Sequence, residues 1–311
     1  MRRPTPFLRR VAASVTMLAA AMSANAVENG APITPFGVFD FGAGMLPPPS
    51  ETGTVGVRAA FYRADELRDN GGDKSAVGLK LKVDSVGVAF VKMTDVELLG
   101  GTYGFAAVLP FLDMSNDLSI PIPGGTLALS GKNSAQGDIQ VAPIIVKWTP
   151  SPGLYTNASL MLQLPTGSYD KNRLINAGTN HWTVSPTFAF TYIVPSGFEV
   201  SSNIQVNVNG NNKDTDYRSG IEYQHEFALG QHFGPWTAGL GGYYYQQLTD
   251  DKSAGVTVKD ARSQVAALGP AVSFFELGSG WPLIWAHAYK EFDARNRSQG
   301  TQVALRAAWT F

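Results

Sequence analysis

Alternation of apolar and polar side chains over ten or more residues is the feature that most limits the fold of this chain. The last twelve residues alternate in this way, with an apolar face of Val303, Leu305, Ala307, Trp309 and Phe311. Successive side chains of a β-strand point to opposite faces, so such a strand has one apolar and one polar face. A half-buried strand of a soluble sheet and a membrane-spanning strand both fit this pattern.

The length of the alternating segments separates these two alternatives. Residues 154–165, 182–194 and 198–209 each alternate over at least ten residues. Ordinary strands average about 5–6 residues, whereas strands that span a membrane need about 9–11. The final segment also resembles the terminal strand of bacterial outer-membrane barrels, in which a C-terminal Phe closes the sheet. These lengths favour membrane-spanning strands.

The N-terminal 26 residues have the organisation of a secretory signal peptide. Four arginines lie within residues 1–10, an apolar run covers 11–22, and Ala24-Asn25-Ala26 is a small-x-small cleavage site. The apolar run is too short for a membrane-spanning helix. Residues 1–26 are therefore expected to direct export, and no later uncharged apolar run reaches the length of a membrane helix. The remaining compartments are the periplasm, the medium and the outer membrane.

Composition agrees with an outer-membrane barrel. Charged residues make up 16% of the chain, which is well below the roughly 25% of soluble domains. Mean hydropathy is only −0.05, as expected when apolar outward residues alternate with polar inward ones. The net charge of −1 argues against a nucleic-acid partner. With no cysteine, the chain has neither disulfides nor cysteine-ligated metals.

Connections alternate between short and long, as they do in outer-membrane barrels. Six long polar connections are predicted at 64–75, 113–137, 166–180, 210–216, 249–261 and 293–300. They imply about twelve strands, at 54–63, 77–93, 100–112, 138–148, 154–165, 182–194, 198–209, 217–229, 236–248, 262–275, 283–292 and 301–311. Within these, 126–130 could extend a strand beyond the membrane, and 84–85 could hold a bulge.

The predicted fold class is all-β: a transmembrane antiparallel up-and-down β-barrel of about twelve strands at 54–311, in the outer membrane. Residues 27–53 do not alternate and contain three consecutive prolines. This segment is either a periplasmic leader or a plug inside the barrel. The expected partners are outer-membrane lipids and the barrel-assembly machinery, which the C-terminal strand would contact.

Strand parity predicts which polar side chains face the lumen. Charges that face lipid cost roughly 2–4 kcal/mol for Arg or Lys at mid-depth, so they are expected inside. The residues opposite the apolar faces are the candidate solute-contacting residues. They are Arg58, Lys80, Lys82, Asn203, Gln205, Arg218, Glu222, Arg262 and Arg306, with Asn207, Gln224, Glu226 and Gln264 as further lumen residues. Salt bridges that merely fill a narrow barrel are the alternative interpretation.

Enzymatic activity has little support in the sequence. His181 lies in a predicted loop without a neighbouring serine motif, and the adjacent Asp250 and Asp251 lie in an outer loop. Aspartates are common in the other predicted loops, where they favour solvated turns. No histidines pair at metal-ligand spacing, so neither a metal nor another cofactor is expected.

Several motifs resemble the family named for the MetA pathway of phenol degradation. They are DFGAGMLPPP at 40–49, LLGGTYGFAAVLP at 98–110, LPTGSYD at 164–170, and the segments 137–143, 178–180, 216–220, 242–247, 268–270 and 290–292. The resemblance spans nearly all of the chain after residue 26. It implies an outer-membrane barrel for the uptake of hydrophobic or aromatic compounds, and it carries over no binding residue.

Three functions follow as hypotheses. The first is passive uptake of small hydrophobic or aromatic solutes, because no energy-coupling motif is apparent. The second is a surface enzyme of the lipase or protease type that would use His181 or Asp250 and Asp251. The third is a structural or adhesive barrel that acts through its loops.

Overall fold

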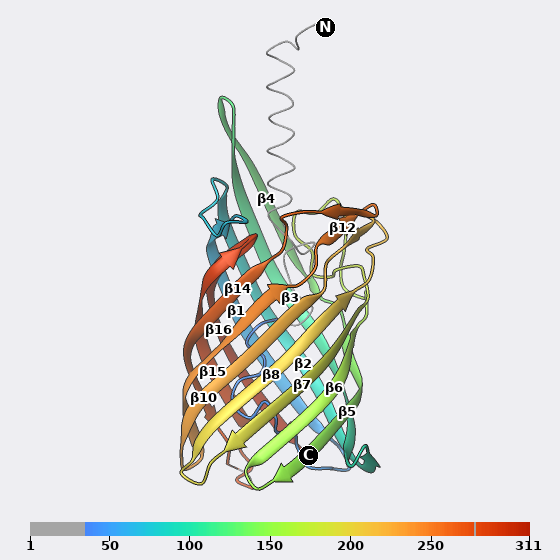
Figure 1. Ribbon diagram of the computed structural model, residues 1–311, viewed down its shortest axis with the longest axis vertical. Coiled ribbons are helices and arrows are strands. Elements are labelled where there is room, and N and C mark those ends of the chain that lie inside the picture. The colour runs from blue at the N-terminus through green and yellow to red at the C-terminus, as the bar shows by residue number, and fades with distance from the viewer. Residues whose placement is uncertain (1–34, 277) are drawn as a thin grey trace, which may run out of the picture.

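Residues 35–276 and 278–311 are described by a computed structural model, shown in Figure 1. The predicted signal peptide, 1–26, and the first part of the predicted leader or plug, 27–34, lie outside the described residues. No helix in the described part of the chain is long and apolar enough to cross a membrane.

The described chain forms a closed antiparallel barrel whose strands are strongly tilted (Figure 1). Neighbouring strands follow the order β2-β1-β16-β15-β14-β11-β10-β8-β7-β6-β5-β3, and pairing of β2 with β3 closes the ring. Their bounds are β1 (Thr54–Arg68), β2 (Gly78–Leu98), β3 (Gly101–Ile122), β5 (Gln140–Ser151), β6 (Leu154–Gln163), β7 (Thr183–Ile193), β8 (Phe198–Asn209), β10 (Glu222–Phe233), β11 (Trp236–Gln247), β14 (Gln264–Phe274), β15 (Leu283–Arg295) and β16 (Arg297–Thr310). The twelve strands of this ring confirm the predicted fold class.

The C-terminal strand closes the barrel against the first. β16 pairs with β1 from Thr54 opposite Thr310 to Arg68 opposite Arg297, with one register shift near Ala64. Closure is needed because lipid offers no hydrogen-bond partner to the unpaired backbone groups of a sheet edge. The alternating C-terminal segment therefore occupies the seam of the barrel, as its pattern predicts.

The longest departure from the predicted connections is at residues 113–137. The sequence predicts a polar loop there, whereas β3 continues to Ile122 and returns as β4 (Gly125–Gln136). β4 lies beside Phe111–Ile122 of β3, and β5 lies beside the earlier half of the same strand, so β4 and β5 share one position in the ring. The β3–β4 hairpin projects beyond the rest of the wall (Figure 1), where both faces of a strand can be polar.

The connection predicted at 293–300 is also shorter than expected. β15 runs to Arg295 and β16 begins at Arg297, so only Asn296, with a φ of 49°, joins them. Asn adopts this left-handed conformation more readily than most residues, which explains why a polar sequence turns so tightly here.

A small cap of strands lies at one end of the barrel. β9 (Tyr217–Arg218), β12 (Asp251–Ser253) and β13 (Val256–Val258) form a separate three-stranded sheet. The strand predicted at 217–229 is therefore interrupted, and its wall portion begins only at Glu222. Phe311 lies at the opposite end, where the connections are short (Figure 1). Because outer-membrane barrels have short periplasmic turns, we assign the capped end to the outside.

The outer and inner faces of the wall differ sharply in chemistry. Exposed apolar side chains on the outside include Phe61, Val86, Val88, Phe90, Phe105, Phe111, Val184, Phe188, Leu240, Leu268, Val303 and Leu305. The inner faces of β7 and β8 instead carry buried polar side chains, including Thr183, Ser185, Thr191, Ser201, Asn203, Gln205 and Asn207. This arrangement presents an apolar belt to lipid and a polar wall to the lumen.

Candidate functional site

The candidate site is the lumen, which is crossed by residues 35–53, here called the inner segment. In Figure 1 this segment lies inside the barrel rather than along its outer wall. Phe36, Phe41 and Asp40 are buried, although the segment forms no strand and pairs with no strand of the wall. Its attachment depends instead on side chains of the wall that bind its backbone.

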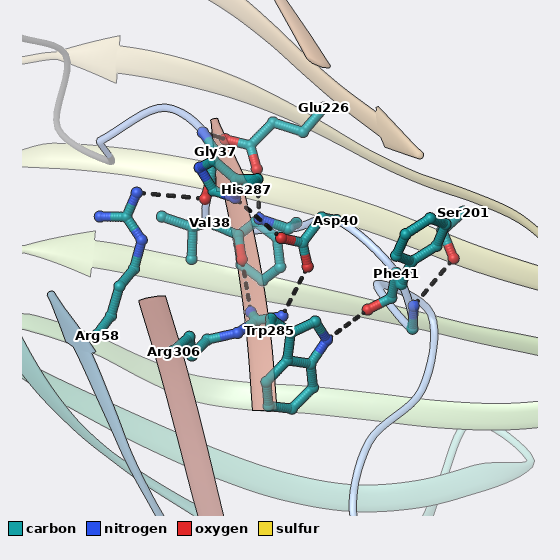
Figure 2. Close-up of polar contacts among 12 residues, drawn as sticks. Gly37, Val38, Asp40, Phe41, Arg58, Ser201, Glu226, Trp285, His287 and Arg306 are labelled. Atoms are coloured by element: carbon teal, nitrogen blue, oxygen red, sulfur yellow. Dashed lines mark hydrogen bonds and ion pairs between the residues drawn. The ribbon is translucent and has the colours of Figure 1, made fainter. Parts of the chain in front are cut away.

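Asp40 is the charged anchor of the inner segment (Figure 2). One carboxylate oxygen pairs with Arg306 of β16 at 3.0 Å, and the other lies 3.1 Å from Nδ1 of His287 on β15. Arg306 also donates to the carbonyl of Val38 at 2.5 Å, and its guanidinium lies 3.9 Å from the ring centroid of Trp285. A buried carboxylate is stable only when it is paired and hydrogen-bonded, and these contacts provide both.

Glu226 of β10 and Arg58 of β1 hold the beginning of the segment. The carboxylate of Glu226 accepts hydrogen bonds from the backbone N–H of Gly37 at 3.0 Å and of Phe39 at 2.5 Å. Arg58 donates to the carbonyls of Phe36 and Gly37 at 3.0 and 3.2 Å (Figure 2). Charged groups make stronger hydrogen bonds than neutral ones, so two opposite walls fix this part of the segment.

Further contacts hold the middle of the segment. The N–H of Gly42 donates to Glu199 at 2.8 Å and to Ser201 at 3.1 Å, and the indole N–H of Trp285 donates to the carbonyl of Phe41 at 2.8 Å. Beyond this point, Lys147 donates to the carbonyls of residues 46 and 47. All of these bonds use side chains of the wall, so the segment can leave without breaking any strand pairing.

Glycines allow the segment to approach the wall this closely. Gly37 has a φ of 70°, and a Cβ there would lie 2.5 Å from Oε1 of Gln302 and 2.7 Å from Nε2 of His287. A Cβ on Gly44 would lie 2.3 Å from the backbone nitrogen of Thr191. Only glycine fits both positions without displacing the wall.

The inner segment packs closely against one side of the wall at this level. The space bounded by Gly37, Asp40, Arg58, His287 and Arg306 is too small to admit a water molecule.

The structure brings five of the nine candidate solute-contacting residues to the inner face, namely Arg58, Asn203, Gln205, Glu222 and Arg306. Arg58 and Arg306 bind the inner segment directly. Gln205 donates to Asn207 at 2.7 Å, and Asn207 donates to Glu222 at 2.9 Å, which forms a polar row along β8 and β10. Asn203 is buried on the same face. The predicted lumen residues Gln224 and Glu226 are buried there too.

The parity prediction is wrong at Lys80 and Lys82. Both share the parity of the exposed Val86 and Val88, and the pairing of β2 with β3 runs without a shift from residue 78 to residue 93. No bulge at 84–85 reverses the alternation. Lys82 pairs on the outer surface with Asp84 at 2.9 Å. The outer face is polar at this end of β2, because Lys82 lies opposite Arg63 of β1 and both pair with Asp84.

Arg262 and Arg218 also lie away from the lumen. Arg262 is exposed and pairs with Asp250 at 2.7 Å, while Gln264 of the same parity is half-buried beside Asp293. Both faces of β14 are apolar: Val265 and Ala267 are buried on the inner face, whereas Leu268 is exposed on the outer one. Arg218 is exposed in the cap sheet rather than in a wall strand.

Several lumen residues were missed by the sequence analysis. Phe36 and Asp40 lie in the segment that does not alternate, and the motif at 40–49 is its one recognisable signal. Trp285 and His287 lie on the inner face of β15, where aromatic side chains give no parity signal that distinguishes lumen from lipid. Their assignment requires knowing what occupies the lumen.

The residues considered for enzymatic activity have structural contacts instead. His181 is buried, and its Nδ1 lies 3.3 Å from the hydroxyl of Thr183. Asp251 accepts hydrogen bonds from the N–H of Gly220 at 2.7 Å and from the side chain of Gln247 at 2.5 Å. Asp250 is paired with Arg262. Among residues 35–276 and 278–311, no group of His, Asp and Glu could hold a metal ion.

Comparison with known proteins identifies the family. The family described as "Putative MetA-pathway of phenol degradation" matches residues 64–307. The chain belongs to this family. A comparison with curated proteins gives no match.

Solved structures show a similar barrel. The crystal structure of an outer-membrane channel from Pseudomonas putida F1 has a TM-score of 0.72 and 17% sequence identity, covering 90% of this chain and 100% of that one. The beta domain of the Bordetella autotransporter BrkA has a TM-score of 0.47 and 13% identity, covering 84% and 100% of the two chains. The CymD monoaromatic hydrocarbon channel has a TM-score of 0.44 and 10% identity, covering 83% and 88%. The first of these confirms the predicted barrel fold.

Replacing Asp40 tests whether its charge anchors the inner segment. In Asp40→Asn the charged partner of Arg306 and His287 is lost, so amide-exchange protection of residues 36–45 should fall at least tenfold, about 1.4 kcal/mol. Hydrogen exchange measured by mass spectrometry checks this, with the exposed Glu51→Gln of the same segment as control. Unchanged protection in Asp40→Asn would contradict the assignment.

The cap should lose stability as the pH rises. Burial raises the pKa of Asp251 from 3.8 to about 6, and the neighbouring Asp250 adds to the increase. The folded cap therefore holds this proton more tightly than an open cap. The resulting stability, at most roughly 3 kcal/mol, is fully present below about pH 4 and is lost as the pH rises through about 6.

Hydrogen exchange in 251–258, corrected for intrinsic rates, should thus be slower at pH 4 than at pH 7.5. Asp251→Asn should remove most of this difference. A pH dependence that persists in Asp251→Asn would assign it to another group.

Proposed function

We propose that this protein is an outer-membrane channel for the passive uptake of small hydrophobic or aromatic compounds, and that residues 35–53 are its plug. The observation that carries the proposal is a closed barrel whose lumen holds a segment attached, at residues 36–47, mainly through side chains of the wall. Such a segment can be displaced while the barrel stays intact, because no ladder of strand pairing has to break.

Family membership supports the class of solute. The family's description refers to phenol degradation, and a bacterium that degrades phenol must first bring it across the outer membrane. The similar barrel from Pseudomonas putida F1 is described as an outer membrane channel. An apolar solute that crosses this barrel would meet the aromatic side chains Phe36, Tyr243, Tyr245 and Tyr289, which form one buried cluster in the lumen.

Uptake by intact cells tests the proposal. Cells that express the protein should take up radiolabelled phenol at micromolar concentration faster than cells without it, and deletion of residues 36–45 should increase the rate further. A sugar such as arabinose serves as the polar control for the wild type. Equal phenol uptake with and without the protein, in cells whose outer membrane is intact, would rule out the transport function.

We further propose that β16 is the strand that the barrel-assembly machinery contacts during insertion. It combines an apolar outer face with the seam position, and Phe311 is anchored there through its N–H to the carbonyl of Gly53 at 3.1 Å.

Phe311→Ser should then lower the amount of heat-modifiable, folded barrel in cells severalfold, because the assembly signal is weakened. Refolding of the purified variant into detergent should be close to that of the wild type. Equal loss in both settings would indicate a stability effect and contradict recognition.

A further inference from the structure

The side chain of Phe36 occupies a pocket that the barrel wall builds around a single aromatic ring. The ring stacks on Tyr243 of β11 with centroids 4.6 Å apart and an interplanar angle of 24°, and its centroid lies 5.2 Å from that of Tyr245. The guanidinium of Arg297, on β16, lies 4.9 Å from the centroid of the same ring. Stacking and cation–π contacts of this kind favour an aromatic ring over an aliphatic group of equal size.

The wall residues of this pocket are held in place without help from Phe36. Glu291 of β15 accepts hydrogen bonds from Tyr243 at 2.8 Å and from Tyr62 at 2.6 Å, as well as from the N–H of Gly300 at 2.7 Å. Arg297 lies 4.0 Å from the same carboxylate. Because these bonds connect wall to wall, the pocket should keep its shape when the ring leaves, which favours binding of another ring.

Hydrogen bonds to its backbone fix the position of Phe36, and its ring takes part in no hydrogen bond. Arg58 holds its carbonyl, and Glu226 holds the next N–H, whereas the ring makes only apolar, stacking and cation–π contacts. A benzyl group and a phenol molecule have nearly the same size. The ring of Phe36 thus has the dimensions of a one-ring solute.

Polar atoms without a hydrogen-bond partner among the described residues lie in the wall next to the pocket, namely the hydroxyl of Tyr245 and Oε1 of Gln224. Gln224 is opposite Tyr245 in the pairing of β10 with β11, and its amide donates to Glu226 at 2.8 Å. The Oε1 atom of Gln224 is buried and accepts no hydrogen bond from the described residues. A buried acceptor without a donor is destabilising, and a hydroxyl group of a ligand would satisfy it.

We propose that the pocket around Phe36 is a binding site for a neutral one-ring aromatic compound carrying a hydroxyl group, and that the ring of Phe36 occupies this site when the compound is absent. The solute displaces the ring of Phe36, stacks on Tyr243 and donates its hydroxyl to Gln224. Competition between solute and Phe36 then links binding to release of the inner segment. This inference rests on the proposed uptake function, whose solute class it specifies, although binding can be measured without transport.

Binding of 4-fluorophenol to the purified barrel, followed by ¹⁹F NMR in detergent, tests the proposal. Phe36→Ala removes the internal competitor and should bind the probe at least tenfold more tightly than the wild type. Val38→Ala is the matched control, because it shortens a neighbouring side chain of the same segment and leaves the pocket filled. In the Phe36→Ala background, Tyr243→Leu should weaken binding at least tenfold, and cyclohexanol should not displace the probe.

Heat-modifiable migration shows whether each variant is folded. If Phe36→Ala does not fold, Phe36→Leu replaces it, with the same direction of change expected because leucine gives up the stacking contacts. Affinity in the folded variant no higher than in the wild type, no effect of Tyr243→Leu, or displacement by cyclohexanol would each overturn the pocket assignment.

The two proposals can fail separately. Tight binding in Phe36→Ala without phenol uptake by cells would support the pocket assignment and contradict the transport function. Uptake by cells without tighter binding in Phe36→Ala would support the transport function and contradict the pocket assignment.

Discussion

Closure of the sheet is the constraint on which the rest of this structure depends. A hydrocarbon environment offers no hydrogen bonds, so every strand must have two neighbours, and β16 must meet β1 along its whole length. Closure also separates two faces with opposite requirements. The outer face is apolar because it contacts lipid. The inner face can hold buried polar groups such as Gln205 and Glu222 because both hydrogen-bond to Asn207.

A closed ring of this size leaves an interior that wall side chains alone do not fill. The inner segment fills it, and its attachment has a consistent character: charged or polar groups of the wall bind backbone atoms of the segment. Asp40 is the exception, since its own side chain pairs with Arg306 and His287. An attachment of this kind is specific in geometry, and it involves no strand pairing that release of the proposed plug would break. The aromatic pocket around Phe36 adds a place where a solute could compete with it.

The sequence predicted the faces of a strand wherever large apolar residues contact lipid and polar residues contact the lumen, as in β7, β8 and β16. The prediction from parity failed in β2, because Leu79 and Leu81 point to one face and Val86 and Val88 to the other. Only the position along the barrel axis decides which of these two sets contacts lipid. It failed again in β14, where Val265 and Ala267 turn inward because the aromatic cluster with Phe36 packs on them. Alternation gives two faces, but it does not say what lies against either.

By itself, the sequence determined the fold class, the approximate number of strands and the seam, because the two-residue period and the strand length are local properties of the chain. Tertiary structure alone decided the path of residues 35–53, the partners of Asp40 and the surroundings of Phe36. Many of those contacts join residues that are far apart in the chain, such as Asp40 and Arg306, and no local pattern encodes them. They form only when the ring closes and brings β10, β15 and β16 around the same volume.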